Sequence, residues 1–269
     1  MNISGKEKFN KAFKLHSDGI LEQAETVYNE ILGENPKNAE VLNLLGVLKL
    51  SQNKLEEAET FITKALSIKK DTYFYENLAK VYEAKKDVTK EIEILEEAIN
   101  TLTCGFEIFF LLGLAYKNNI EYEKAEKAYL KAIEINPESE KACYNLASLY
   151  LFLNNPQKAI EYFQKCHEIN PEDKEVLYFL SLGYLRIKDY KTGLKYFENR
   201  LCRNTAIISQ QVTYPNILKK APIWQGEDIS DKTLYTYYEA GFGDMIMFAR
   251  YLPELQKRCK KIILKGISL

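Results

Sequence analysis

The chain has 269 residues, of which 46% are hydrophobic and 28% are charged, so it is long and apolar enough to bury a sizeable core. Its formal net charge of −1 gives no reason to expect nucleic acid or an anionic membrane as a partner, because both require a clustered basic face. No run of about 18 apolar residues predicts a transmembrane helix, and the charged residues 1–14 lack the apolar core of a secretory signal. Five scattered cysteines without a C-x-x-C pair argue against a disulfide framework and a zinc site, and favour a reducing cytoplasm.

Residues 1–203 repeat one pattern with a period of about 34 residues. A small residue in the middle of an apolar stripe recurs at Ala12, Gly46, Ala79, Gly113, Ala147 and Ser181. A second small residue follows at Ala24, Ala58, Ala125, Ala159 and Gly193, and Glu91 is the one departure, in the third repeat. Small side chains let two antiparallel helices approach closely, and apolar residues three and four positions apart give each helix a stripe to bury. The period therefore predicts six helix pairs.

The clearest unit is residues 106–139, with the sequence FEIFFLLGLAYKNNIEYEKAEKAYLKAIEINPES. Its ordered positions are Phe109, Leu112, Gly113, Tyr116, Ala125, Tyr129 and Pro137. This spacing resembles the W-x2-L-G-x2-Y…A-x3-F…P pattern of the tetratricopeptide repeat family. We expect Asn118 and Asn119 to form the turn between the two helices, and Pro137 to end the second helix.

The resemblance implies an all-α fold, a right-handed superhelical solenoid of six helix pairs. The repeats are placed near residues 5–38, 39–71, 72–105, 106–139, 140–173 and 174–203. In the family, the first helix of each repeat forms most of a concave wall, and a peptide segment of a partner protein binds in that groove. The resemblance thus implies a protein–protein interaction scaffold.

Two or three residues of each first helix are expected to line the groove. They are Phe9, Asn10, Phe13, Asn43, Val47, Asn77, Lys80, Phe110, Leu114, Tyr144, Asn145, Tyr178 and Leu182. Apolar and aromatic side chains outnumber charges among them, which favours an amphipathic or apolar peptide over an acidic tail. The alternative is that neighbouring repeats bury much of this surface against one another.

Three of these residues, Asn10, Asn77 and Asn145, occupy the same place in repeats one, three and five. In the tetratricopeptide domains of O-linked N-acetylglucosamine transferases, an asparagine ladder at this place holds the backbone of a bound peptide. The amide group of asparagine suits that role, because it can both donate and accept a hydrogen bond. Here only every other repeat has the asparagine. The alternative is that these are merely polar residues on a partly exposed helix face.

Beyond residue 203 the period ends. Residues 204–222 contain two prolines and no helical stripe, so we expect a linker there. Residues 232–238 and 260–266 are predicted strands, with a helix over residues 245–259 between them. We therefore expect residues 223–269 to be the incomplete β-α-β start of a Rossmann-like domain.

The tail motif, P-x-W-x-G…E-x-G-x-G-D-x-x-x-F-A-R-Y-L-P-x-L, spans residues 222–255. It resembles the opening of the glycosyltransferase-like domain that is fused behind tetratricopeptide repeats in many bacterial proteins. The loop with Glu239, Gly241 and Gly243 also resembles the first loop of heptosyltransferases, and this resemblance implies that Asp244 is the catalytic base. The alternative is structural, since the glycines allow a tight turn and Asp244 can cap the following helix.

Two functions are left open by the sequence. We expect an interaction scaffold for a protein or peptide, with no cofactor, no metal and no catalytic activity of its own. The alternative is the N-terminal part of a bacterial tetratricopeptide-repeat glycosyltransferase, which transfers a sugar from a nucleotide-sugar donor to protein or glycan. The chain as given would then be inactive, because two parallel strands and one helix cannot build the donor site.

Overall fold

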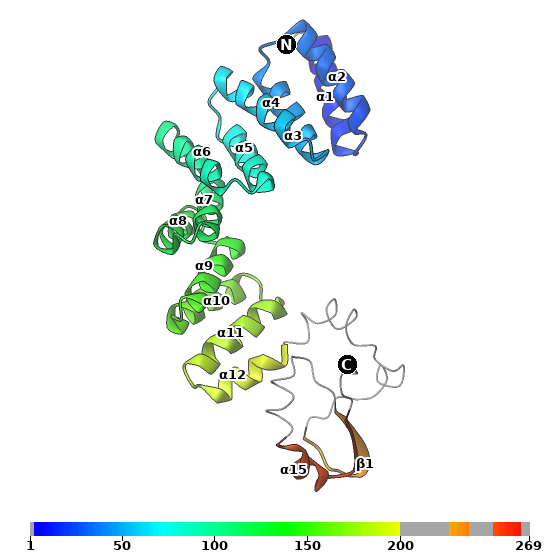
Figure 1. The fold of residues 1–269 in the computed structure, drawn as a ribbon, viewed down its shortest axis with the longest axis vertical. Coiled ribbons are helices and arrows are strands. Elements are labelled where there is room, and N and C mark those ends of the chain that lie inside the picture. The colour runs from blue at the N-terminus through cyan, green and yellow to red at the C-terminus, as the bar shows by residue number, and fades with distance from the viewer. Residues whose placement is uncertain (1–2, 200–225, 237–249, 265–269) are drawn as a thin grey trace. The chain divides into compact units, whose positions relative to one another are not determined.

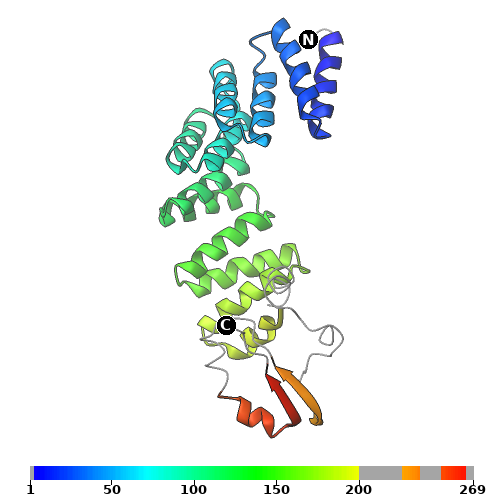
Figure 2. The ribbon, with the colours of Figure 1, turned by 45° about the vertical axis from the view of Figure 1, so that its right-hand side comes forward.

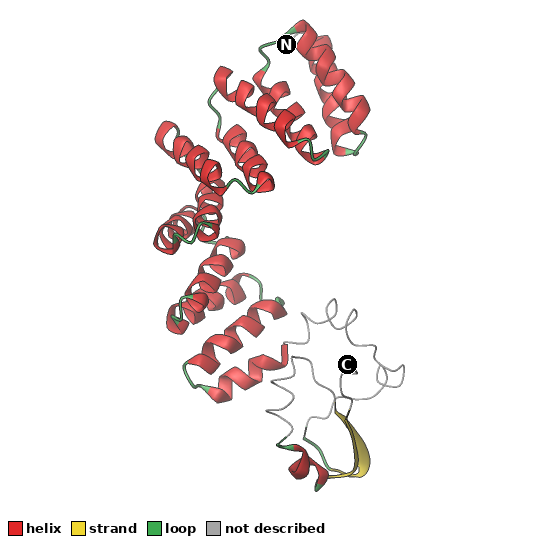
Figure 3. Ribbon diagram, viewed as in Figure 1, coloured by secondary structure: helices red, strands yellow, loops and turns green. Residues whose placement is uncertain are grey.

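The computed structural model describes residues 3–199, 226–236 and 250–264. Two compact units divide the chain, Met1–Asn199 and Arg200–Leu269, and each is described here by itself. In its described residues the first unit is helical, and the second contains two strands and a short helix (Figure 3). The expected linker at residues 204–222 lies outside the described residues.

Residues 3–199 form twelve helices, which short turns join into six consecutive pairs (Figures 1 and 2). The helices are α1 Ile3–Ser17, α2 Leu21–Glu34, α3 Ala39–Ser51, α4 Leu55–Ile68, α5 Thr72–Lys85, α6 Val88–Thr101, α7 Phe106–Asn118, α8 Tyr122–Ile135, α9 Glu140–Phe152, α10 Pro156–Ile169, α11 Lys174–Arg186 and α12 Tyr190–Phe197. The two helices of each pair pack on one another, and the second helix of a pair packs on the first helix of the next pair. The prediction of six helix pairs is confirmed.

Within the fourth and sixth pairs, a glycine of one helix lies directly against a large side chain of the other. A Cβ atom on Gly113 would lie 2.5 Å from the ring of Tyr129 on α8, and one on Gly193 would lie 2.8 Å from Leu185. Ala125 is fully buried at the Gly113 junction. These separations are shorter than van der Waals contact, so a larger side chain at position 113 would force the two helices apart.

The turn inside each pair contains one residue in the left-handed backbone conformation. These residues are Gly19, Asn53, Lys86, Ile120, Asn154 and Lys188, with φ between 57° and 76°. Glycine and asparagine tolerate this conformation, whereas a β-branched residue such as Ile120 is strained in it. The turn predicted at Asn118 and Asn119 is shifted by one residue, because α7 continues through Asn118 and the chain reverses at Asn119 and Ile120.

A tyrosine, a carboxylate and a lysine recur where one repeat packs on the preceding one. The Tyr82 hydroxyl on α5 donates a 3.0 Å hydrogen bond to Glu59 on α4, and Lys90 Nζ lies 5.5 Å from the centre of the tyrosine ring. The equivalent sets are Tyr116 with Glu96 and Lys124, and Tyr150 with Glu126 and Lys158. Burial and the Glu59 carboxylate raise the pKa of Tyr82 to about 12, so the hydroxyl stays a donor at neutral pH.

The second repeat keeps the carboxylate of the preceding repeat, Glu25, but changes the two other residues of this cluster. Lys49 takes the place of the tyrosine, and Glu57 takes the place of the lysine. Lys49 Nζ lies 2.6 Å from Glu25 and 3.0 Å from Glu57, and its side chain is only 5% exposed. The two carboxylates offset the loss of hydration that an enclosed ammonium group would otherwise suffer.

The core follows the stack of helices. Buried side chains of repeats two to six form one continuous hydrophobic cluster, and a smaller cluster joins repeats one and two. Tyr28, Tyr75, Tyr129 and Phe163 are the largest fully buried side chains. Every pair therefore depends on its neighbours for burial, as expected of a repeat array.

The third repeat places a carboxyl group where the other pairs have a small residue. Glu91 on α6 is only 4% exposed. Burial raises the pKa of the Glu91 carboxyl to about 7, and the nearby Glu83 adds to this rise. The departure noted in the sequence is thus a buried acid inside a helix pair.

In the second unit, β1 (Ile229–Thr236) and β2 (Cys259–Leu264) pair in parallel, and α15 (Leu252–Gln256) precedes β2. The register runs from Thr233 opposite Lys261 to Thr236 opposite Leu264. Two parallel strands were predicted, and this is confirmed. The helix predicted over residues 245–259 is described only within 252–256, and it ends earlier than expected because Cys259 already belongs to β2.

Candidate functional site

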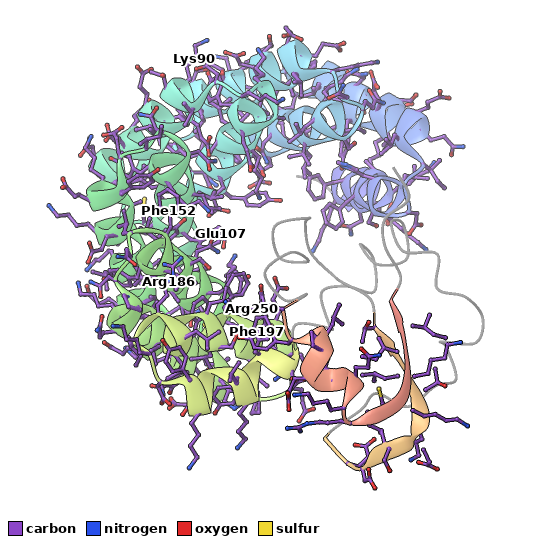
Figure 4. All side chains as sticks on the ribbon, turned by 60° about the horizontal axis from the view of Figure 1, so that its bottom comes forward. Lys90, Glu107, Phe152, Arg186, Phe197 and Arg250 are labelled. Atoms are coloured by element: carbon purple, nitrogen blue, oxygen red, sulfur yellow. The ribbon has the colours of Figure 1, made fainter. Side chains whose placement is uncertain are left out.

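The first helices of the six pairs carry the residues predicted to line a groove. In Figure 4, Glu107 on α7 lies toward the inner side of the curved array, and Lys90 on α6 lies at its outer rim. Phe13 is 52% exposed and Asn10 is also exposed. The half-buried members are Phe9, Val47, Lys80, Leu114, Tyr144, Asn145, Tyr178 and Leu182. The remaining three, Asn43, Asn77 and Phe110, are buried.

The three asparagines of the predicted ladder differ in exposure and in hydrogen bonding. Asn77 is 4% exposed, and its Nδ2 donates a 3.1 Å hydrogen bond to Oδ1 of the buried Asn43. Asn145 donates a 2.8 Å hydrogen bond to the carbonyl of Lys141 in its own helix. Helices α3 and α5 approach closely enough for their asparagines to pair, which the spacing of the sequence could not show. Of the three ladder residues, only Asn10 is exposed.

The aromatic residues of the predicted wall pack between repeats. Phe110 is 8% exposed, and Lys141 Nζ lies 4.6 Å from the centre of its ring. The Tyr144 hydroxyl donates a 3.1 Å hydrogen bond to Glu175 on the next first helix. Tyr178 is likewise half-buried. Phe110 is therefore buried, contrary to the exposure expected of it, whereas Tyr144 and Tyr178 keep part of their surface exposed.

A hollow of about 290 Å³ opens between repeats four and five. It is lined by Lys117 of α7, Tyr122 of α8, and Ser148, Leu149 and Phe152 of α9. The rings of Phe152 and Tyr122 are 5.3 Å apart and tilted by 59°. Phe152 is 69% exposed, more than any other aromatic residue in the described part of the chain. The hollow thus has an apolar wall that stands largely open to solvent.

The hollow continues the row of predicted groove residues. Lys117, Ser148 and Phe152 follow the small residue of their own helix by four, one and five positions. Residues at these offsets share one face of an α-helix, which is also the face of Leu114. Neither Lys117 nor Phe152 is among the groove residues predicted from the sequence. An aromatic residue at the last position of a first helix was the available signal, because it lies beyond the stripe that the pair buries.

The charges around the hollow are unbalanced. Lys117 is half-buried, burial lowers the pKa of its ammonium group, and among the described residues it forms no ion pair. Arg186, at the end of α11, donates a hydrogen bond from Nη1 to the carbonyl of Leu151, next to Phe152 (Figure 4). Both cations lie at helix C-termini, where the helix dipole favours positive charge. No described carboxylate forms an ion pair with Arg186.

One hydroxyl at the hollow is without a partner. The Ser148 Oγ atom is enclosed and makes no hydrogen bond with the described residues. A rotation about χ1 that turns this hydroxyl outward would therefore break no existing hydrogen bond. The arrangement can offer an apolar surface, an ammonium group and a hydroxyl donor to one bound group.

The tail residues predicted to be functional lie outside the described residues. These are Glu239, Gly241, Gly243 and Asp244, and their roles stay predictions. In the described parts of the chain, no three His, Cys, Asp or Glu side chains are grouped so that they could hold a metal ion. None of the described helices is both long and apolar enough to cross a bilayer.

Models of the tetratricopeptide repeat match three stretches of the chain, residues 15–81, 106–139 and 140–173. Together these stretches cover half of the 269 residues. They include repeats four and five, between which the hollow lies.

Curated relatives share only part of their length with this chain. It is 28% identical over 172 residues to the antiviral innate immune response effector IFIT1 of Macaca fascicularis, covering 55% of this chain and 36% of that protein. It is 28% identical over 123 residues to the BBSome complex member BBS4 of Bos taurus, covering 46% of this chain and 24% of that protein. The chain thus spans about a third or less of the length of these two relatives.

Solved structures share the fold of the array. The pilF protein of Pseudomonas aeruginosa has a TM-score of 0.65 and 16% identity, covering 77% of this chain and 95% of that one. The type IV pilus biogenesis factor PilW has a TM-score of 0.62 and 16% identity, covering 81% and 98%. YrrB, described as a TPR protein with an unusual peptide-binding site, has a TM-score of 0.56 and 20% identity, covering 64% and 89%.

Proposed function

The chain is a tetratricopeptide repeat protein, and we propose that it is a protein-interaction scaffold that binds an extended peptide segment of a partner. The segment lies along the first helices of the pairs and is anchored at the hollow between repeats four and five. Its binding needs no cofactor and no nucleic acid. The cytoplasm, which the cysteine usage favours, is the proposed compartment.

The observation that carries this proposal is the hollow itself. Most aromatic side chains of the first helices are buried or half-buried, but Phe152, beside Tyr122, is 69% exposed. An exposed aromatic side chain beside a hollow can anchor a bound peptide. Contact with the peptide removes apolar surface from water, which favours binding. YrrB, a protein of similar fold, has a peptide-binding site according to its description.

A selection experiment tests the proposal directly. Short random peptides are selected on the full chain, and the enriched peptides are titrated by fluorescence anisotropy against the native chain and Phe152→Ala. Loss of the aromatic anchor should weaken binding about tenfold or more, which corresponds to burial of one large apolar side chain. The matched control is Leu194→Ala on α12, an apolar residue that is 57% exposed but distant in sequence from the hollow. Equal losses in both variants, or no enriched peptide, would contradict the proposal.

The tail supports a second candidate function. Strands β1 and β2 pair in parallel with α15 preceding β2, as the start of a Rossmann-like glycosyltransferase domain would require. On this proposal the chain belongs to a sugar transferase, and Asp244 is its catalytic base. Nucleotide release from a sugar-nucleotide donor is the assay. Nucleotide release by the full chain that Asp244→Asn abolishes would support this candidate, and release that Asp244→Asn leaves unchanged would contradict it.

A further inference from the structure

We infer that the hollow between repeats four and five recognises a large apolar side chain next to a side-chain carboxylate, within an internal segment of a partner protein. This inference rests on the proposed function, and it specifies the chemistry of the bound segment. The two parts of the signal are a ring or branched chain that enters the hollow and an aspartate or glutamate beside it.

The apolar part follows from the volume and walls of the hollow. About 290 Å³ is room for one large side chain, and Tyr122, Leu149 and Phe152 supply the apolar contacts. The tilted arrangement of Phe152 and Tyr122, with ring centres 5.3 Å apart, leaves the outer face of Phe152 open. A bound aromatic ring can pack on that face in the offset or edge-on geometry that such rings prefer.

The acidic part follows from the charges around the same hollow. Lys117 is half-buried without an ion-pair partner among the described residues, and this loss of hydration disfavours its charged form, as the lowered pKa indicates. By contrast, the more deeply buried Lys49 forms ion pairs with both Glu25 and Glu57. A bound carboxylate would give Lys117 the partner that the described residues do not provide, and the Ser148 hydroxyl, which forms no hydrogen bond with them, can add a second donor.

The position of the hollow favours an internal residue over a chain terminus. First-helix residues continue on both sides of it, through the half-buried Leu114 of repeat four and the half-buried Leu182 of repeat six. A segment bound in the hollow can therefore extend in both directions. Arg186, hydrogen-bonded to the Leu151 carbonyl beside Phe152, supplies further positive charge on the side of repeat six.

An array of synthetic peptides tests the inference on the full chain. The peptides are acetylated and amidated, have random flanks without acidic residues, and carry a fixed central pair of Phe-Asp, Phe-Asn, Ala-Asp or Phe-Lys. We expect binding to Phe-Asp to exceed binding to Phe-Asn about tenfold, the value of one charge-assisted hydrogen bond. Lys117→Met should remove the preference for Phe-Asp over Phe-Asn, whereas Phe152→Ala should remove the preference for Phe-Asp over Ala-Asp.

Two controls separate the possible failures. Lys80→Met alters another half-buried lysine of a first helix and should leave both preferences unchanged. A further set of peptides carries its only carboxylate at a free C-terminus, and tighter binding of that set would overturn the choice of an internal residue. If peptides bind but the central pair has no influence, the inference is wrong while the scaffold function stands. If no peptide of any set binds, both are wrong.

Discussion

The third and fourth repeats are neighbours with the same helix lengths to within one residue, yet their pairs close differently. In the fourth repeat, Gly113 lies against the ring of Tyr129, with no room for a side chain at position 113. In the third repeat, the corresponding small residue is the buried Ala79, and Glu91 on the second helix is also buried. Both repeats contact the preceding repeat in the same way. The Tyr82 hydroxyl donates a hydrogen bond to Glu59, and the Tyr116 hydroxyl donates one to Glu96. The array therefore tolerates an acid inside a pair as long as the contacts between pairs are kept.

The largest loss of stability is expected where Gly113 lies against Tyr129 in the fourth repeat. Gly113→Leu would drive a side chain into Tyr129 and should lower the free energy of unfolding by about 1–3 kcal/mol. Chemical denaturation measures this loss. Gly33→Leu is the matched control, because no atom lies within 4 Å of a Cβ at Gly33, and it should cost nothing. Similar losses in both variants would show that the close approach at Gly113 does not matter.

In the helix pair of the third repeat, Glu91→Ala should stabilise the protein. The pKa of Glu91 is about 7 in the folded chain, above its ordinary value of 4.5, so the folded chain binds more protons between these pH values. Stability should fall as the pH rises through this window, and the full penalty, of order 2 kcal/mol, should be present above pH 7. Glu91→Ala should flatten this part of the pH profile of unfolding.

The control for this profile is Glu93→Ala, which removes an exposed carboxyl from the same helix. It should leave the pH dependence unchanged. A native profile that is flat between pH 5 and 8 would mean that the Glu91 carboxyl is hydrated and not buried.

The turn of the fourth repeat offers a smaller gain. Ile120 is 71% exposed and has a φ of 64°, while the turns of repeats two and five use Asn53 and Asn154. Ile120→Asn should raise the free energy of unfolding by about 1 kcal/mol, because asparagine tolerates the left-handed conformation. The reverse change, Asn53→Ile, should lower it by a similar amount. Thermal or urea unfolding of the two variants should shift in opposite directions.

The smallest effects should be the same in both repeats. Tyr82→Phe and Tyr116→Phe each remove one partly buried hydrogen bond to a carboxylate of the preceding repeat. Each should cost about 0.5–1 kcal/mol, the net value of a single hydrogen bond. Denaturation of the two single variants would measure this, and a clearly larger loss in one of them would show that the two contacts are not equivalent.

The sequence predicted the helix pairs well because their signal is local and repeated. A small residue that recurs about every 34 positions in an apolar stripe, such as Gly113, indicates that a second helix approaches closely there. The parallel strands of the tail were also predicted, since β-branched residues on either side of a helix indicate a β-α-β unit. The turn at Ile120 was misplaced because nothing in its side chain indicates a left-handed conformation.

By itself the sequence determined the six pairs, their junctions and the acid in the third repeat, because each depends on residues within one repeat. The tertiary structure alone decided which first-helix side chains face solvent, because that depends on how neighbouring repeats stack. Stacking pairs Asn77 with Asn43 and buries Phe110, yet it leaves Phe152 open and Lys117 without an ion-pair partner among the described residues. Helical periodicity gives the face of one helix, but the exposure of that face is fixed by atoms contributed from the next repeat.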